Sequence, residues 1–170
     1  MGLFDIFTGT KRPKPGVAVA TPSELKEALL AVNRPTAPFS IGLSDDGSCD
    51  LVAEWKIVDA KWYEIFAKAG LEKSFKIKMR LDEQAKEVRN IDEEFTVEWR
   101  AGVPKLSLMV SGFRGQKSEI SFGTAYAFTE QFKPGQVYNY RFNSSELKDP
   151  LRDAVLASGW TWKSVAFGKL

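Results

Sequence analysis

The sequence predicts an α+β domain in which a strongly curved, mainly antiparallel sheet of about seven or eight strands packs against two or three amphipathic helices. Three observations support this prediction. Apolar residues recur at every second position in one long stretch, they recur at helical spacing elsewhere, and turn residues separate the segments. At 170 residues the chain is long enough to form one core without disulfides or a metal ion.

The clearest strand signal lies at residues 73–81. Apolar and basic side chains alternate there, with Phe75, Ile77, Met79 and Leu81 on one side and Lys76, Lys78 and Arg80 on the other. This period of two is typical of a strand with one buried face. Polar residues at 82–85 then predict a turn.

A second strand follows this turn, and its alternation is marked by Phe95, Val97 and Trp99. A two-stranded ribbon is stable only when a partner layer covers its apolar face. We therefore expect these three side chains to share one apolar face with the first strand, beneath the helices.

The first helix signal follows a Pro-rich stretch near the N-terminus. Thr21 is a suitable N-cap, Pro22 suits the first helical position and Glu24 completes a capping box. These residues predict a helix over 22–32. Residues 60–69 also show helical spacing of apolar side chains, although their aromatic content would suit a strand.

A late helix is expected to begin at Asp149–Pro150, with Asp149 as the cap and Pro150 at the first helical position. Leu151, Ala154 and Val155 form its apolar stripe. Ser158–Gly159 ends it. Further strands are expected at 39–43, 51–58, 105–111, 118–128, 137–142 and 160–167.

The sequence divides into a flexible tail and linker at 1–20 and a single α+β domain at 21–170. The tail carries an apolar cluster in which Leu3, Phe4 and Phe7 are the expected contacts with a membrane or a protein partner. Pro, Gly and Lys residues in the segment that follows are typical of an extended linker.

The amino-acid composition excludes several kinds of catalytic and metal-binding site. The chain has no histidine, which removes Ser-His and Cys-His nucleophile pairs and the imidazole ligands of most zinc and iron sites. Cys49 is the single cysteine, so an intramolecular disulfide is impossible. With 24 basic and 22 acidic residues there is no global attraction to nucleic acid. We expect a cytoplasmic protein without a cofactor or metal.

Paired carboxylates occur three times, at Asp45–Asp46, at 92–94 and at Glu146 with Asp149. General acid–base catalysis needs two acids held in different environments within a cleft. These pairs fall in expected turns or helix caps, where acids are common for structural reasons. No catalytic residue is therefore assigned, and nothing in the sequence points to an enzyme.

Two groups of residues are candidates for binding. Lys76, Lys78, Arg80 and Arg89 are either a solvated sheet face or a surface for an anionic ligand, and the absence of interleaved aromatic residues disfavours nucleic acid. The second group consists of aromatic residues that either fill the core or line a pocket mouth, namely Trp160, Trp162, Tyr138 and Tyr140.

Three segments carry a resemblance to other proteins: VAEWKIVDAKWYEIFAKAG, KMRLDEQAKEVRNIDEEFTVEWRAG and ELKDPLRDAVLASGWTWKSVAFGKL. They look like a family of bacterial proteins without an assigned activity, over roughly residues 50–170. The order of strands followed by a late helix is also similar to tubby-like proteins, including the LURP-one and scramblase-related groups. That resemblance implies lipid binding, although Arg152 and Asp153 make the late helix amphipathic rather than apolar all round.

The sequence therefore predicts a non-enzymatic binding or interaction module, acting at an anionic membrane surface or on a protein partner. One alternative is a carrier of small apolar ligands with a cavity between the sheet and the helices. The other is an enzyme that works without histidine.

Overall fold

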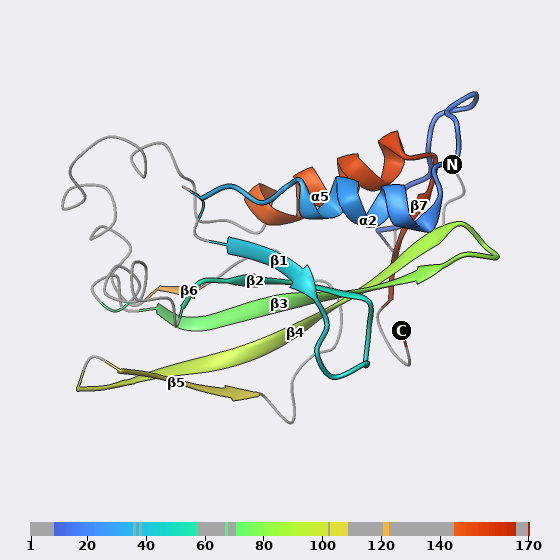
Figure 1. Cartoon of the computed structure of the whole chain (residues 1–170). Helices are drawn as coiled ribbons and strands as arrows, with labels where there is room; N and C mark the ends of the chain where they lie inside the picture. The colour runs from blue at the N-terminus through green and yellow to red at the C-terminus, as the bar shows by residue number, and fades with distance from the viewer. Residues whose placement is uncertain are drawn as a thin grey trace.

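The computed structural model describes residues 9–35, 37, 39–57, 67, 71–101, 103–108, 121–122, 145–165 and 170. The elements within them, labelled as in Figure 1, are α2 (Pro22–Leu30), β1 (Phe39–Leu43), β2 (Leu51–Trp55), β3 (Leu71–Asp82), β4 (Glu87–Arg100), β5 (Val103–Leu108), β6 (Ser121–Phe122), α5 (Ser145–Ala157) and β7 (Thr161–Ser164). An α+β fold with a curled, mainly antiparallel sheet is confirmed.

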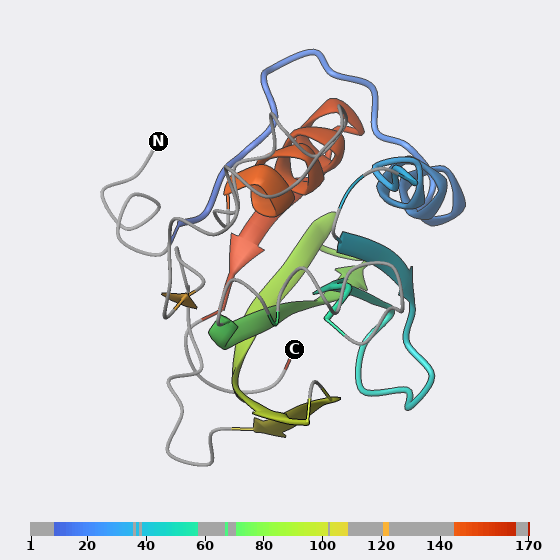
Figure 2. The ribbon, with the colours of Figure 1, turned by 90° about the vertical axis from the view of Figure 1, so that its left-hand side faces the viewer.

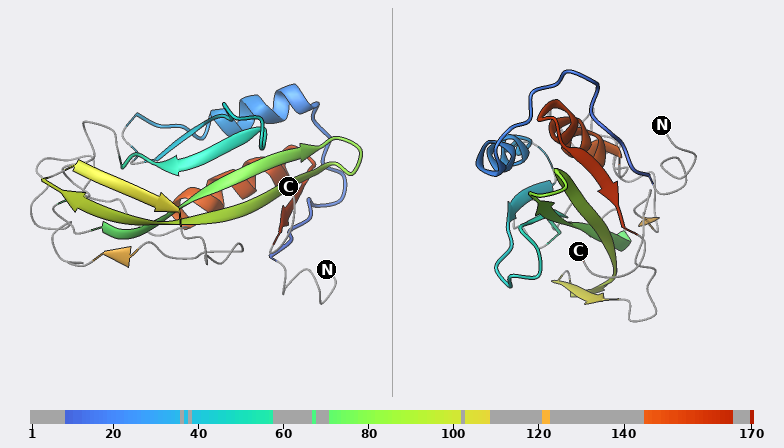
Figure 3. Two further views of the ribbon diagram at one scale, coloured as in Figure 1. Left: turned by 90° about the horizontal axis from the view of Figure 1, so that it is seen from below. Right: turned by 90° about the vertical axis from the view of Figure 1, so that its right-hand side faces the viewer.

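The sheet follows the order β1-β2-β3-β4-β5, and each of these neighbours is antiparallel. The two-residue strand β6 pairs with β3, whereas β7 pairs in parallel with β4. The long β3–β4 ribbon twists along its length, which gives the sheet its curl (Figures 1 and 3). The predicted helix at 60–69, apart from helical Ala67, and the predicted strand at 137–142 lie outside the described residues.

Helices α2 and α5 lie beside each other on one face of the sheet, as Figures 1 and 2 show. We call this covered face the inner face and the opposite one the outer face. The core between the helices and the inner face contains fully buried apolar side chains, including Leu25, Leu29, Phe39, Leu51, Ile77, Met79, Leu147 and Leu151. Phe75 is also buried, and Leu81 packs against this core in a partly exposed position.

Helix α2 begins where the capping box predicts. The backbone N–H of Glu24 donates to Thr21 Oγ1 at 3.3 Å, and the backbone N–H of Thr21 donates to Glu24 Oε2 at 2.8 Å. The helix ends at Leu30, two residues before the predicted end. Ala31 closes it by donating its N–H to the carbonyl of Glu27.

Asn33, just after this helix, binds the open side of strand β1. Its Nδ2 donates to the carbonyl of Ile41 at 2.7 Å, and its Oδ1 accepts from the backbone N–H of Ile41 at 2.7 Å. The side-chain amide therefore replaces a neighbouring strand at the centre of β1. Such pairing satisfies backbone groups that an edge strand would otherwise leave open.

Replacing Asn33 with alanine is expected to lower the free energy of unfolding by about 1–3 kcal/mol, because both groups of Ile41 lose their partner in a partly buried site. Urea denaturation followed by circular dichroism measures this loss. Asn33→Asp is the matched control, since aspartate still accepts from the Ile41 N–H but cannot donate to its carbonyl. An alanine variant as stable as the wild type would contradict the role assigned to Asn33.

The register of the β3–β4 ribbon corrects one prediction. Leu81 lies opposite Val88 and Ile77 opposite Asp92, without a shift between them. Directly paired residues point to the same face, so the even-numbered residues of β4 point inward. By this register Phe95, Val97 and Trp99 leave the ribbon on the side opposite Phe75 and Ile77, but Val97 is still buried in the same apolar cluster and Trp99 packs against it. The four-residue turn at 83–86 sets this parity, so Asn90 and Asp92 take the inner positions of β4 opposite Met79 and Ile77.

The start of α5 also differs from the prediction. The helix already includes Ser145, so Pro150 lies inside it rather than at its first position. Proline lacks the N–H that would bond four residues back, but its fixed φ remains compatible with a helix. The end agrees with the prediction: the N–H of Gly159 donates to Leu156 and that of Trp160 to Val155, which is a Schellman motif.

Residues 9–20, placed in the sequence-predicted linker, lie along the C-terminal elements. Lys11 and Trp162 exchange two backbone hydrogen bonds, of 2.8 and 2.9 Å. Further along, the N–H of Ala20 donates to Ser158, and its carbonyl accepts from Trp160 Nε1 at 2.9 Å. We call residues 9–20 the strap. The tail residues Leu3, Phe4 and Phe7 lie outside the described residues.

Candidate functional site

The inner face carries a buried ion pair between β4 and α5. Lys148 Nζ donates to Asp92 Oδ2, and the Asp92 side chain is 0% exposed while that of Lys148 is 16% exposed. The lysine ammonium also lies 5.6 Å from the centre of the Phe75 ring. The first turn of α5 is thereby fixed to the middle of the sheet.

Polar residues continue along the inner side of β4. Asn90 is fully buried, and its Nδ2 donates to the carbonyl of Lys163 at 2.9 Å. The Ser164 hydroxyl lies 3.4 Å from Asn90 Oδ1 and 3.4 Å from the carbonyl of Gly9. These contacts join β4 to β7 and to the start of the strap.

The carboxylates at 92–94 therefore do not lie in a turn, as their sequence context predicts, but in the middle of strand β4. Asp92 points inward to Lys148, whereas Glu93 points outward to two lysines. The ion pair neutralises its own charges, which fits a structural contact rather than an acid–base pair. Within the described ranges, no group of three or more Cys, Asp or Glu side chains is arranged to hold a metal ion.

On the outer face, two of the predicted anion-binding lysines are already paired. Lys78 Nζ lies 3.3 Å from Glu93 Oε1, and Lys76 Nζ lies 3.8 Å from Glu93 Oε2. Lys78 also donates to the Ser48 hydroxyl at 3.1 Å. Lys76 lies above the Phe95 ring, 5.0 Å from its centre. The charge of these two lysines is thus partly offset by the protein itself.

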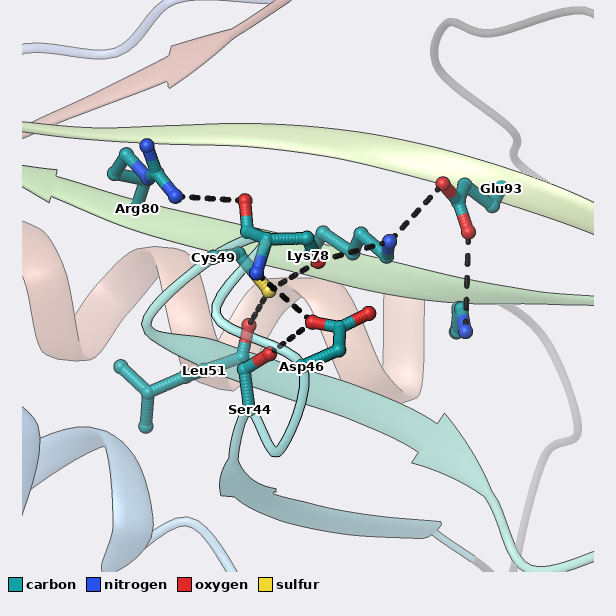
Figure 4. A network of polar contacts seen from close by, with 9 residues as sticks. Ser44, Asp46, Cys49, Leu51, Lys78, Arg80 and Glu93 are labelled. Carbon is teal, nitrogen blue, oxygen red and sulfur yellow. Dashed lines mark hydrogen bonds and ion pairs between the residues drawn. The ribbon is translucent and has the colours of Figure 1, made fainter. Parts of the chain in front are cut away.

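The loop at 44–50 packs over the same face and holds Arg80 (Figure 4). Arg80 Nη2 donates to the carbonyl of Ser48 at 2.8 Å and to that of Gly47 at 3.2 Å. Neutral carbonyls bind the guanidinium but leave its charge uncompensated. They also fix its direction on β3.

Asp46 organises this loop from within. Its Oδ1 accepts from the backbone N–H of Ser48 at 2.9 Å and from the Ser44 hydroxyl at 2.8 Å (Figure 4). Hydrogen bonds from Ser48, then from Ser44, and the nearby charge of Lys78 hold the pKa of Asp46 well below its ordinary value. The ionised carboxylate is therefore the form that the folded loop stabilises.

Because the pKa of Asp46 is lowered in the folded state, the stability of the folded protein depends on pH. A carboxyl whose pKa is lowered in the folded state stabilises that state above the unfolded pKa, which is 3.8, and loses this contribution as the pH falls. Asp46→Asn is therefore expected to be less stable than the wild type at pH 7 and to approach it as the pH drops below about 4. Thermal unfolding of both proteins between pH 2 and 7 measures this. A deficit that stayed constant across that range would contradict the assignment.

Arg89 is a second cation of the outer face to which no carboxylate is bound among the described residues. It lies directly opposite Arg80 in the β3–β4 register, so two like charges share one cross-strand position. Its Nε is buried, and within the described residues no hydrogen bond or ion pair is made by this side chain. An unsatisfied buried donor costs about 1–3 kcal/mol, which an anion at this position would relieve.

Lys163 extends this pair to a third strand. It lies beside Arg89 in the parallel β4–β7 register, and its Nζ lies 3.3 Å from Glu87 Oε2. We call Arg80, Arg89 and Lys163 the cation row. The row crosses three adjacent strands of the outer face, and strand β7 is also the strand along which the strap begins.

The predicted aromatic ligand-binding residues divide into two groups. Trp160 is fully buried and Trp162 is 3% exposed, and both belong to the core. Tyr138 and Tyr140 lie outside the described residues. The predicted pocket mouth therefore stays a prediction.

Sequence reasoning found Arg80 and Arg89 but missed Lys163 and the Asp92–Lys148 pair. The available signal for the pair was the position of Lys148 immediately beside the apolar stripe of its helix, next to buried Leu147. For Lys163 no signal existed, because the parallel pairing of β7 with β4 joins residues 74 positions apart.

In the part of the chain that the structure describes, no helix is both long enough and apolar enough to cross a bilayer. Comparison with family models, with curated proteins and with solved structures finds no match to this chain.

Proposed function

We propose that this chain is a non-enzymatic binding module that docks on an anionic membrane surface through the cation row. The observation that carries the proposal is the Arg80–Arg89 pair, two like charges at one cross-strand position with no carboxylate bound to either among the described residues. Opposed like charges destabilise a sheet unless a partner compensates them. A surface of lipid phosphates would supply that compensation.

The strap begins at the strand that carries Lys163. Gly9, the first described residue, lies beside the Ser164 hydroxyl on the inner side of β7, whereas Lys163 lies on the outer side of the same strand. The apolar tail residues precede this point in the chain. An apolar segment and basic side chains together give stronger membrane binding than either alone. We further infer a cytoplasmic location, where the membrane leaflet is anionic, and a complete sheet of about seven or eight strands with two or three helices.

Co-sedimentation with vesicles tests the proposal. Full-length protein is expected to bind vesicles containing phosphatidylserine and not vesicles of phosphatidylcholine alone. Arg80→Gln with Arg89→Gln is expected to weaken binding roughly 30-fold, because each basic residue near an anionic surface contributes about 1 kcal/mol.

Lys26→Gln with Lys105→Gln is the matched control. It removes the same net charge from α2 and β5, away from the row, and should reduce binding much less. Equal losses in both double variants would show a nonspecific effect of net charge and would overturn the proposal. If the partner is instead an acidic protein, the full-length chain should bind that protein but not the vesicles. The variant with both Arg80→Gln and Arg89→Gln should then bind that protein more weakly than the wild type.

A further inference from the structure

We propose that the cation row is a site for a single phosphate group, carried either by a lipid headgroup or by a soluble phosphomonoester or inorganic phosphate. This inference rests on the proposed function and gives it a chemical specificity. It makes the row a defined recognition site rather than a diffuse patch of charge.

The arrangement of donors is the first argument. Neighbouring strands are about 4.8 Å apart, so three residues in register on three adjacent strands span a distance of about 10 Å. Arg80 uses Nη2 to bind the loop carbonyls, which leaves Nε–H and Nη1 as separate single donors, whereas Arg89 keeps a complete fork. Planar guanidinium groups bind phosphate oxygens in pairs, which a point-charge ammonium cannot do.

The nearby acids give the second argument, since each already has a partner within the protein. Glu87 is paired with Lys163, and Asp82 Oδ1 accepts from the backbone N–H groups of Gln84 and Ala85. Asp50 Oδ2 accepts from the N–H of Leu81. Among the described residues, none of these carboxylates is therefore bound to Arg80 or Arg89, and the donors of both arginines stay open to a ligand.

The third argument concerns Arg89 itself. Its Nε–H is buried without a hydrogen bond, so among the described residues no hydrogen bond or ion pair fixes the direction of this guanidinium. Rotation of the side chain toward a phosphate oxygen would satisfy that donor and place the Arg89 fork beside a single donor of Arg80 on one ligand. Lys163, whose side chain is 43% exposed, completes the site by turning from Glu87 to the phosphate.

Titration of the full-length protein with inorganic phosphate, followed by the arginine Nε–H signals in NMR spectra, tests the inference. We expect the Arg89 signal to shift saturably, as for one site, and not to shift with chloride at equal ionic strength. Arg89→Lys keeps the charge but loses the fork, so it should weaken phosphate binding about tenfold or more. Its thermal unfolding verifies that this variant folds.

A second arm identifies the source of the phosphate. Vesicles of phosphatidic acid and of phosphatidylserine are compared at matched surface charge. A preference for phosphatidic acid that Arg89→Lys abolishes assigns the site to a lipid headgroup. Saturable binding of inorganic phosphate without that preference assigns it to a soluble phosphate.

The inference is overturned if Arg89→Lys binds phosphate as tightly as the wild type, or if neither arm shows a phosphate-dependent response. If it fails while the double glutamine variant still loses phosphatidylserine binding, the proposed function stands without the phosphate site. If that variant binds phosphatidylserine like its charge-matched control, the proposed function fails as well.

Discussion

Replacing Lys148 with methionine is expected to lower the free energy of unfolding by about 3–5 kcal/mol, because it leaves the buried Asp92 carboxylate without its lysine. Methionine has a similar length and retains contact with Phe75, so the loss reports mainly the uncompensated charge. Equilibrium denaturation in urea at pH 7 measures it.

The double variant Asp92→Leu with Lys148→Met is the control for this prediction. Removing both charges leaves no uncompensated group, and apolar replacements of buried ion pairs are often neutral or stabilising. The double variant should therefore be closer to the wild type than Lys148→Met is. A single variant within about 1 kcal/mol of the wild type would show that the pair is not buried as described.

Gly159→Ala is expected to destabilise the chain by roughly 2–5 kcal/mol. Gly159 has a φ of +74°, which costs an L-residue about 1–2 kcal/mol. A Cβ there would also lie 2.6 Å from the carbonyl oxygen of Ala18 and 2.9 Å from Val19 Cα, both backbone atoms of the strap. The variant must therefore move either the strap or the end of α5. The change in melting temperature measures the effect.

Gly16→Ala separates the two contributions. Gly16 has a φ of +86°, but a Cβ there meets no atom within 4 Å. This variant should show only the conformational cost, and the difference between the two variants measures the close approach of the strap to Gly159. Equal losses would show that the strap does not pack against this glycine.

Local sequence signals predicted several elements well. The period of two in β3, the capping box of α2 and the glycine that ends α5 each act over a few residues, so their physical cause is contained in a short segment. The burial of Phe75, Ile77 and Met79 confirms the inner face of β3. These features need no knowledge of the tertiary structure.

The inner side of β4 could not be predicted in the same way. Its register depends on the length of one turn, and a change of one residue moves every side chain to the other face. The apolar signal of Val97 and Trp99 correctly indicated packing against the core but not the register, which gives the inner positions of β4 to Asn90 and Asp92. Helix α5 brings Lys148 to this buried aspartate from 56 residues away in the sequence.

The candidate site could be predicted only in part, because it too depends on which strands pair and in which register. The sequence shows Arg80 and Arg89 as basic residues but not that they oppose each other, nor that Glu93 offsets Lys76 and Lys78 instead. Only the pairing of the strands shows which basic residues lie beside a carboxylate and which do not. The cation row is thus a property of the tertiary structure.

The most direct test of the account is to map where an anionic membrane contacts the protein. NMR spectra of the full-length chain, recorded with and without nanodiscs containing phosphatidylserine, report each residue separately. We predict that signals of Arg80, Arg89 and Lys163 shift or broaden, while that of Lys26 on α2 does not. Changes confined to α2 and α5, with the cation row unaffected, would contradict the account.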